Sequence, residues 1–493
     1  MRLLALLLAV TPPDPHALVD GAIAAMQRNT SLGDIRSVRL AGAQHDWILG
    51  NAERAEGPWR VGYSQFSELH DIRNASLRRT AQSVLPTGAK SADRITILVD
   101  SVVANRTGNR EIGASKSFYE DVIDRVDGSP IRALLLASRS PALKYERVVK
   151  HYGVTFDVVS FPWRNGRMEL ELNRDSHLPG AVEIVRPYSD NFRWAPFGDV
   201  HMRADYVDWN VQPSGAYWPM QVKVSLNGEP LRDVTFATVA LDTAAPAADS
   251  FAVSDSARLQ SVAASKLDFS RFRLGMRGQP TELEPGIVRV PDQWTQTLVR
   301  QPDGVVIFEA HISGQYLMDV IGEAHKRWPG APIKALVMTS DPWAHLGGVR
   351  QAMALGIPIY VSSGSVPFLT ALAKMPHTME PDSLAKVPRA PKFIPVVGKT
   401  VIGRGENQIE LYPVGGEYGE RMLMAYFPGH KVLYGADLVF PNRGPDGKVD
   451  KGFFETSAVD LRRAVAREKL AVDSLFCVQA SPIMAWDAFS VTP

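Results

Sequence analysis

A loop in the C-terminal half carries the side chains of this chain that are best suited to chemistry. It reads Thr339-Ser340-Asp341-Pro342-Trp343-Ala344-His345-Leu346-Gly347-Gly348. A hydroxyl, a carboxylate and an imidazole are the groups that a serine hydrolase combines. The chain has no Gly-x-Ser-x-Gly elbow to present such a serine, and a triad drawn from one loop would be unusual geometry. Asp341 and Trp343 are equally well explained as loop-packing residues, with Asp341-Pro342 forcing an extended bend.

The sequence on either side indicates how this loop is held. Residues 304–310 and 333–339 are short apolar runs typical of buried strands, and residues 316–328 have helical periodicity. The predicted order is strand, helix, strand, loop and Gly-Gly.

This order resembles the metallo-β-lactamase superfamily, whose loop reads His-x-His-x-Asp-His and supplies ligands to one or two zinc ions. The resemblance covers residues 276–493 and implies an αββα sandwich. When the family pattern is laid on this chain, Ser340 and Pro342 occupy the first two His positions and Ala344 occupies the Asp position. Only His345 stands on its expected residue. Proline and alanine side chains offer zinc no lone pair, and a neutral hydroxyl is a poor substitute for imidazole.

Three later runs resemble family strands, at residues 422–428, 431–437 and 475–478. Asp437 matches the Asp that closes the second of them. Glu417 or Tyr418 stands near another family His, and no histidine follows His430. Because a catalytic zinc ion needs about three protein ligands, we expect no metal site. Zinc would enter only if the site proves active.

The resemblance implies a cleft at one edge of the sandwich. Its candidate catalytic residues are His345, Asp437 and Asp341; its candidate lining is Glu309, Ser340, Trp343, Glu417, Tyr418 and Arg421. A lining that mixes acid, base and aromatic groups suits a small polar ligand. In the purely structural alternative, His345 hydrogen-bonds the loop and Asp437 is a buried carboxylate that accepts backbone N–H groups.

The N-terminal half alternates between strand-like runs and helical segments. Strands are predicted at 38–49, 59–69, 94–103, 155–161, 168–172, 181–185, 200–209, 221–226 and 234–240, and helices at 15–27, 117–126 and 131–145. Asn165-Gly166 and Asn227-Gly228 are predicted hairpin turns in which both central residues have positive φ. The fold class is therefore α+β, with an antiparallel, curved N-terminal sheet and helices.

The run from Tyr206 to Trp209, followed by Tyr217-Trp218-Pro219 and the Asn227-Gly228 hairpin, resembles lipoprotein-carrier half-barrels of the bacterial envelope. That resemblance implies a concave sheet that shelters a lipid or another apolar envelope component. A generic β domain whose aromatic residues fill its own core is the alternative.

Composition and the N-terminus complete the prediction. A net charge of +1 gives no electrostatic case for nucleic acid. Residues 1–14 resemble a short signal peptide, although they also fit the apolar start of a cytosolic helix. The predicted organisation is that segment, a β domain at 15–242, a linker at 243–275 and the αββα domain at 276–493. We expect a secreted or periplasmic, noncatalytic binding protein; the alternative is a divergent hydrolase of esters, amides or lactams that uses His345 and Asp437.

Overall fold

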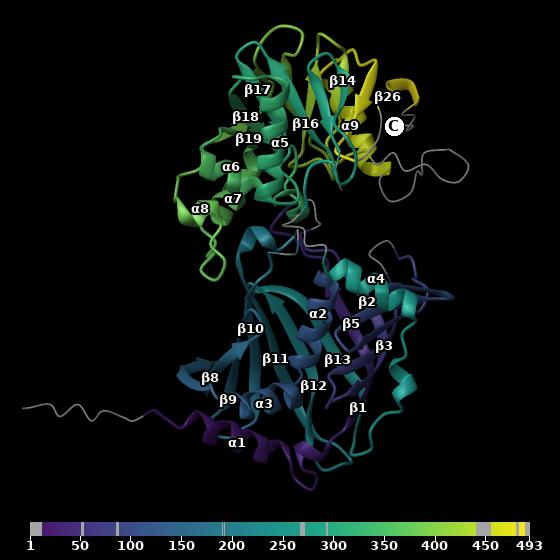
Figure 1. Ribbon diagram of the computed structural model, residues 1–493, viewed down its shortest axis with the longest axis vertical. Helices are drawn as coiled ribbons and strands as arrows, with labels where there is room; N and C mark the ends of the chain where they lie inside the picture. The colour runs from purple at the N-terminus through teal and green to yellow at the C-terminus, as the bar shows by residue number, and fades with distance from the viewer. Residues whose placement is uncertain are drawn as a thin grey trace, which may run out of the picture. The chain divides into compact units, whose positions relative to one another are not determined.

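The computed structural model describes residues 12–50, 54–84, 88–189, 191, 193–266, 272–291, 294–439, 455–479 and 483–488. These residues form an α+β protein of two compact units (Figure 1). Unit 1 consists of Met1–Trp47, Val61–Arg186 and Val200–Lys266, and unit 2 of Ile48–Arg60, Pro187–Asp199 and Leu267–Pro493. Residues 1–11 of the signal-peptide-like segment and residues 267–271 of the predicted linker lie outside the described residues.

Unit 1 is built on one 13-stranded sheet in the order β6-β5-β4-β3-β2-β1-β13-β12-β11-β10-β9-β8-β7. Its strands are β1 (Ser37–Trp47), β2 (Val61–Asp71), β3 (Ser76–Val84), β4 (Arg94–Val99), β5 (Val102–Thr107), β6 (Arg110–Gly113), β7 (Lys144–His151), β8 (Val154–Trp163), β9 (Gly166–Asn173), β10 (Pro179–Pro187), β11 (Asp199–Val211), β12 (Tyr217–Leu226) and β13 (Glu229–Asp242). Strands consecutive in sequence lie side by side except β6 and β7, which form the two edges, and β1 pairs antiparallel with β13. The predicted antiparallel sheet is therefore confirmed.

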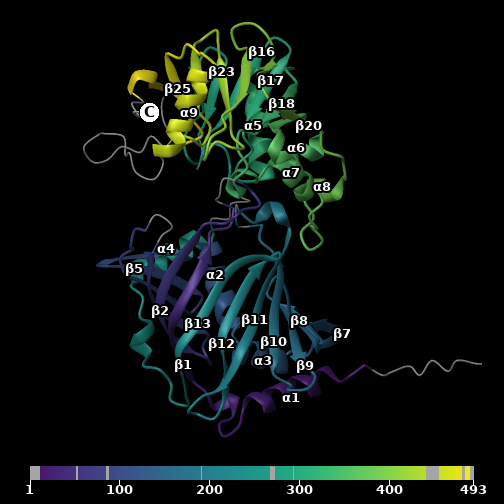
Figure 2. The ribbon, with the colours of Figure 1, turned by 180° about the vertical axis from the view of Figure 1, so that it is seen from behind.

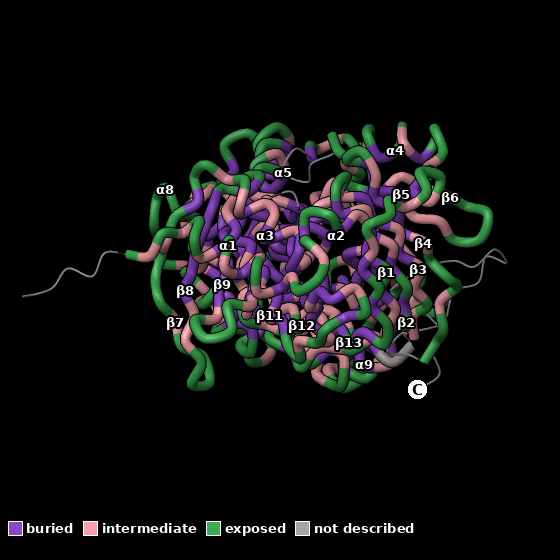
Figure 3. Tube along the Cα trace, turned by 90° about the horizontal axis from the view of Figure 1, so that it is seen from below, coloured by how far each residue is buried: buried purple, intermediate pink, exposed green. Residues whose placement is uncertain are grey.

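Helices cover one face of this sheet. They are α1 (Pro15–Met26), α2 (Lys116–Asp127) and α3 (Pro130–Ser138), and α4 (Asp255–Ser265) lies beside β5 and β6. Figures 1 and 2 show α2 and α3 across the same face, and Figure 3 shows buried segments gathered around them. On β11, Met202, Ala204 and Tyr206 are buried at alternate positions, as expected where one face of a strand meets the core. No helix among the described residues is long and apolar enough to cross a membrane.

The two predicted hairpin turns differ in outcome. Asn227 and Gly228 are the central residues between β12 and β13, and both have positive φ, so that prediction is confirmed. The other prediction is wrong by one residue, because Trp163 pairs with Gly166 and the turn is made by Arg164 and Asn165. Only Arg164 of these two has a positive φ.

Two longer predicted elements are also wrong in part. The run at 94–103 is two strands, because Asp100 and Ser101 both adopt left-handed backbone angles and reverse the chain. A short polar side chain such as Asp or Ser tolerates this conformation in a tight turn. The helix predicted over 131–145 ends at Ser138, and β7 begins at Lys144.

Unit 2 contains two sheets. The first has the order β14-β15-β16-β17-β18-β19-β20: Thr281–Glu284, Ile287–Val290, Gln296–Gln301, Gly304–Phe308, Ile333–Val337, Ile359–Ser362 and Phe393–Val396. The second has the order β21-β22-β23-β24-β25-β26: Thr400–Ile402, Ile409–Pro413, Leu423–Phe427, Val432–Tyr434, Ser474–Phe476 and Met484–Ala485. Strands β17 to β20 run parallel, as do β24 and β25.

The two sheets pack face to face with helices outside them. Val306, Phe308 and Val337 of the first sheet share one buried cluster with Leu411 and Phe427 of the second. The helices are α5 (Gly314–Arg327), α6 (Val349–Leu355), α7 (Val366–Ala373), α8 (Ser383–Lys386) and α9 (Glu455–Arg467). Figure 1 shows α5, α6 and α7 beside the first sheet, and α9 packs on the far face of the second. The described part of unit 2 thus has the αββα layer order.

Trp343 contacts the two segments from the N-terminal half of the chain that belong to unit 2. Its ring contacts Trp59, Trp194 and Phe197, with centroid distances of 5.1, 4.8 and 4.5 Å. Trp59 belongs to the segment between β1 and β2, and Trp194 and Phe197 to the segment between β10 and β11. The indole is 3% exposed. One side chain therefore gathers three chain segments into a single aromatic cluster, defined here as the Trp343 cluster.

Polar contacts reinforce the Trp343 cluster. Its indole N–H donates to the Ala55 carbonyl at 2.8 Å, and its backbone N–H donates to the Gly50 carbonyl at 3.1 Å. Gly50 has φ +71°, and a Cβ there would lie 2.5 Å from the Trp343 ring. In the second segment, the Asp199 carboxylate accepts the backbone N–H groups of Thr378 and Met379. Both segments are thus held by hydrogen bonds as well as by ring packing.

We expect Trp343→Ala to lower the free energy of unfolding of the full chain by about 3–5 kcal/mol, because it empties a buried aromatic site and leaves the Ala55 carbonyl unpaired. Trp343→Phe should cost less, since most of the ring contacts remain. Chemical denaturation followed by circular dichroism measures the change. The exposed Tyr152→Ala is the control and should leave stability unchanged. An unaltered Trp343→Ala transition would show that the Trp343 cluster contributes nothing to stability.

Candidate functional sites

The polar residues of unit 2 gather where its parallel strands end. Glu309 follows β17, Thr339 and Ser340 follow β18, and Asp437 and Gln479 follow β24 and β25. Parallel neighbours place their carboxyl ends at the same sheet edge, so residues distant in sequence meet there. Glu309, His311, Ser340, His345, Tyr434 and Asp437 form the group defined here as the buried polar cluster.

Glu309 lies at the centre of this cluster and is fully buried. Its Oε1 accepts the Thr339 hydroxyl, the Thr339 backbone N–H at 3.2 Å and the Tyr434 hydroxyl at 3.3 Å. Its Oε2 has no hydrogen-bond partner among the described residues. One carboxylate oxygen is therefore saturated and the other is available.

His311 is a member of the cluster that the sequence analysis missed. It is fully buried, its Nε2 lies 3.8 Å from Glu309 Oε2, and its ring meets the His345 ring edge-on at 4.5 Å. Neither ring nitrogen has a hydrogen-bond partner among the described residues. The signal was in the sequence, because Glu309-Ala310-His311 ends a predicted buried strand and both side chains reach its carboxyl edge.

Ser340, His345 and Asp437 lie next to one another in that order. Ser340 Oγ lies 3.0 Å from His345 Nδ1, and His345 Nε2 lies 3.8 Å from Asp437 Oδ2. Gln479 donates to Asp437 Oδ1 at 2.7 Å. A neutral His345 that accepts the Ser340 proton at Nδ1 carries its own proton at Nε2, on the side of Asp437. The order is that of a nucleophile, a base and an orienting acid.

Burial keeps most of this cluster uncharged. It raises the pKa of Glu309 to about 7, and the Asp437 charge acts in the same direction against the hydrogen bonds from Thr339 and Tyr434. Burial also raises the pKa of Asp437, opposed by His345 and Gln479. The pKa of His345 is lowered by burial, and that of His311 is lowered well below its usual value by burial and by His345. Near neutral pH the two imidazoles are therefore neutral bases.

The backbone around the cluster is strained. Glu309, Ile312 and Ala436 have φ values of 66°, 65° and 50°, a region that is unfavourable for residues other than glycine and most of all for β-branched Ile312. Gly347 packs so closely on the Ile312 carbonyl that a Cβ there would lie 2.3 Å from its oxygen. The Gly-Gly pair therefore allows the backbone of the 339–348 loop to pack closely against the backbone of residues 310–312.

Asp341 points to a different set of partners. Its Oδ2 accepts from the Ser365 hydroxyl at 2.8 Å and lies 3.4 Å from Arg421 Nη1, which also binds Glu56 at 2.5 Å. Burial raises the pKa of Asp341 to about 6 against these two donors. Asp341 and Arg421 thus share an ion-pair network with Glu56 of the 48–60 segment.

The remaining predicted site residues lie in other environments. Glu417 is exposed, and Tyr418 stacks near Arg60 and donates its backbone N–H to Asp460 at 2.9 Å. Trp343 lies within the aromatic cluster described above. Of the predicted residues, the structure therefore brings together Glu309, Ser340, His345 and Asp437.

The buried polar cluster does not fit a family-type zinc ion. Zinc binds three or four ligands at about 2.0–2.2 Å. His345 Nδ1 is engaged by Ser340 and is therefore not available to a metal ion in this arrangement. Among the described residues, no three His, Cys, Asp or Glu side chains are grouped so that they could hold a metal ion.

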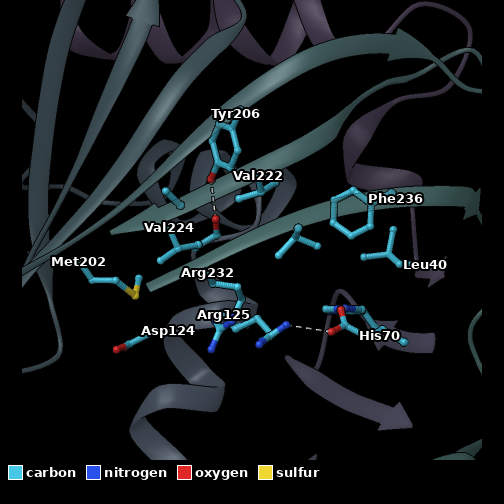
Figure 4. Close-up of a pocket in the computed structure, with 14 residues that line it drawn as sticks. Leu40, His70, Asp124, Arg125, Met202, Tyr206, Val222, Val224, Arg232 and Phe236 are labelled. Carbon is cyan, nitrogen blue, oxygen red and sulfur yellow. Dashed lines mark hydrogen bonds and ion pairs between the residues drawn. The ribbon is translucent and has the colours of Figure 1, made fainter. Parts of the chain in front are cut away.

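Unit 1 holds a second candidate site, a cavity of about 70 Å³ between α2 and the covered face of the sheet (Figure 4). Most of its wall is apolar and comes from β1, β11, β12 and β13: Leu40, Met202, Ala204, Val222, Val224, Val234 and Phe236. Tyr206 also lines the cavity and donates its hydroxyl to the Gly128 carbonyl, which fixes the end of α2. Apolar walls with a few polar groups are typical of ligand sites.

Comparison with known proteins gave matches by structure alone, since no protein-family model and no curated protein sequence matches the chain. A stereoselective inverting sec-alkylsulfatase from Pseudomonas sp. is 16% identical with a TM-score of 0.31 over 42% of this chain. Metallo-β-lactamases from Pontibacter korlensis and Erythrobacter litoralis are 16% and 14% identical, with TM-scores of 0.33 and 0.30 over 43% of this chain. The matches span 39% of the sulfatase, and 94% and 92% of the two lactamases.

Glu309 should make stability depend on pH. Because its folded pKa of about 7 lies above the usual 4.5, its contribution is full below pH 4.5 and is lost as the pH rises through 7, by up to about 3 kcal/mol. Glu309→Gln cannot lose a proton and should flatten this decline in urea unfolding measured between pH 4.5 and 8. The exposed Glu417→Gln should follow the wild-type profile. A Glu309→Gln profile identical to wild type would rule out Glu309 as the titrating group.

Proposed function

We propose that this chain is a noncatalytic binding protein of the bacterial envelope, whose unit 2 is a metallo-β-lactamase-like domain that has lost its zinc. The observation that carries the proposal is the state of the buried polar cluster. Glu309, His311, Ser340 and His345 are each at most 4% exposed, and among the described residues no three His, Cys, Asp or Glu side chains are grouped so that they could hold a metal ion. A substrate would need both an entrance and a third ligand for the zinc ion that activates water in such enzymes.

The apolar cavity of unit 1 supports binding of an apolar chain there. It lies on the helix-covered face of a large antiparallel sheet, and its wall is mostly aliphatic. Removing aliphatic surface from water is favourable, so an alkyl chain gains free energy by entering such a site. The envelope location rests on the signal-peptide-like residues 1–14 and on the lipoprotein-carrier resemblance of the sequence.

A second candidate is the divergent hydrolase, and one observation favours it. The contact of 3.0 Å between Ser340 Oγ and His345 Nδ1 is the distance at which a neutral imidazole accepts a serine proton. The distance of 3.8 Å from His345 Nε2 to Asp437 is longer than a hydrogen bond. Ser340 is 4% exposed, so little of its surface is open to an ester carbonyl in the described structure.

The two candidates predict different kinetics. For a noncatalytic unit 2, Ser340→Ala and His345→Ala should leave any release of nitrophenol from p-nitrophenyl esters unchanged, and metal content by plasma mass spectrometry should stay far below stoichiometric. Ser363→Ala, on the exposed surface of the same unit, is the matched control. If both cluster variants reduce turnover by about 10²-fold or more while the control does not, the hydrolase takes first place. One equivalent of zinc in the wild type would also contradict the proposal.

The unit 1 site can be tested by filling it. Ala204→Phe places a ring in the cavity and should abolish retention of aliphatic ligands, at a stability cost of about 1–3 kcal/mol. Val207→Phe adds a ring on the opposite face of β11 and should not alter retention. The measurement is the rise in melting temperature with 1-octanol, because a ligand of the native state stabilises it. Equal shifts in Ala204→Phe and wild type would exclude this cavity as the site.

A further inference from the structure

The cavity of unit 1 has a charged end as well as an apolar wall. Figure 4 shows Arg125 and Arg232 opposite Val222 and Val224 of β12, with His70 and Asp124 on either side. Glu68 lies at the same end and is 4% exposed at its side chain. A site with one apolar side and one ionic end suits a ligand built the same way.

All four arginines at this end have a carboxylate partner, and Arg125 has only one that it shares with another arginine. Arg79 binds Glu68, which also accepts from His70 Nε2 at 2.8 Å. Arg232 Nε binds Asp46 at 3.1 Å. These pairs neutralise one positive charge each, so the acidic groups beside the cavity are largely committed.

Arg186 completes the set. Its Nη2 binds Asp124 Oδ2 at 2.8 Å, and its Nη1 lies 3.0 Å from Glu120. Asp124, which lines the cavity, is thereby paired with Arg186. Arg186 thus contacts two carboxylates, whereas Arg79 and the fourth arginine share Glu68.

Arg125 is that fourth arginine. Its Nη1 shares Glu68 at 3.2 Å with Arg79 and reaches Gln44 Oε1 at 3.4 Å, and these are its hydrogen bonds within the described structure. A guanidinium carries five N–H groups, so Nε and Nη2 are available toward the cavity. Arg125 belongs to the last turn of α2, and its side chain is 19% exposed.

The electrostatic environment of Arg125 is unfavourable for a cation. Burial, together with the charges of Arg232 and Arg79, lowers its pKa to about 9 against the opposing effect of Glu68 and Asp46. A negative charge placed at this end would relieve that repulsion. A second cation would increase it.

We propose that the cavity binds an amphiphile with a single carboxylate head group, the class of the fatty acids, with the head on the free N–H groups of Arg125 and the chain along the aliphatic wall. The planar fork of arginine matches a carboxylate, and charge-assisted hydrogen bonds are stronger than neutral ones. The volume of about 70 Å³ holds several water-sized groups, enough for the head and its first methylene groups. This inference rests on the proposed binding function, to which it adds the chemistry of the ligand.

The test compares four probes with the full chain by isothermal titration calorimetry: octanoate, 1-octanol, octylammonium and acetate. We expect octanoate to bind roughly 10-fold to 100-fold more tightly than 1-octanol, octylammonium to bind more weakly than either, and acetate to bind least. Arg125→Gln should reduce the affinity for octanoate to that for 1-octanol, and Arg125→Lys should retain part of the preference. Arg139→Gln, on the exposed end of α3, is the matched control and should behave as wild type.

The outcomes separate this inference from the proposal beneath it. Equal affinity of the wild type for octanoate and 1-octanol, or a preference that survives in a folded Arg125→Gln variant, overturns the carboxylate assignment and leaves apolar binding intact. Failure of every probe overturns both. Thermal unfolding of Arg125→Gln shows whether the variant is folded, and if it is not, the Arg125→Lys comparison with wild type decides.

Discussion

The arrangement of unit 2 depends on the burial of the Trp343 indole. Trp343 stands in the same loop as Ser340 and His345, so the rings and carbonyls that fix it also fix the residues on either side. An indole can be buried at little cost only when its N–H finds an acceptor, and here the acceptor comes from the 48–60 segment. The geometry of the 339–348 loop, the burial of the polar cluster and the attachment of the 48–60 and 187–199 segments thus all depend on the contacts of the Trp343 side chain.

The sequence predicted the elements whose pattern is local and continuous. Residues 304–310, 333–339 and 422–428 are predominantly apolar runs, and each corresponds to a buried strand within about two residues at either end. The run at 94–103 failed because its turn, Asp100-Ser101, lies within a stretch that otherwise alternates like one strand. The turn predicted at Asn165-Gly166 was wrong by one residue, because the pairing of Trp163 with Gly166 places the turn at Arg164 and Asn165. Sheet order and the membership of residues 48–60 in unit 2 are long-range properties without a local signal.

The candidate sites were predictable to different extents. The Ser340 and His345 contact follows from their place in one loop, and the approach of Asp437 follows from the family frame. His311 was missed because that frame holds no ligand at its position. Arg125 gave no signal at all, since a charged residue on a helix normally faces water, and its neighbours Glu68 and Arg232 come from strands far away in the sequence. The two sites also differ in kind: one is a buried group of acids and imidazoles whose charged forms are disfavoured by burial, and the other is a network of ion pairs.

Because each unit is made of several separate segments of the chain, a single cut cannot separate one complete unit from the other. The polypeptide passes from one unit to the other five times, at residues 47/48, 60/61, 186/187, 199/200 and 266/267. The αββα core alone, expressed from residue 272 onward, would lack Trp59, Trp194 and Phe197 and would present Trp343 to solvent. A single recombination event at the apparent boundary would therefore transfer an incomplete unit.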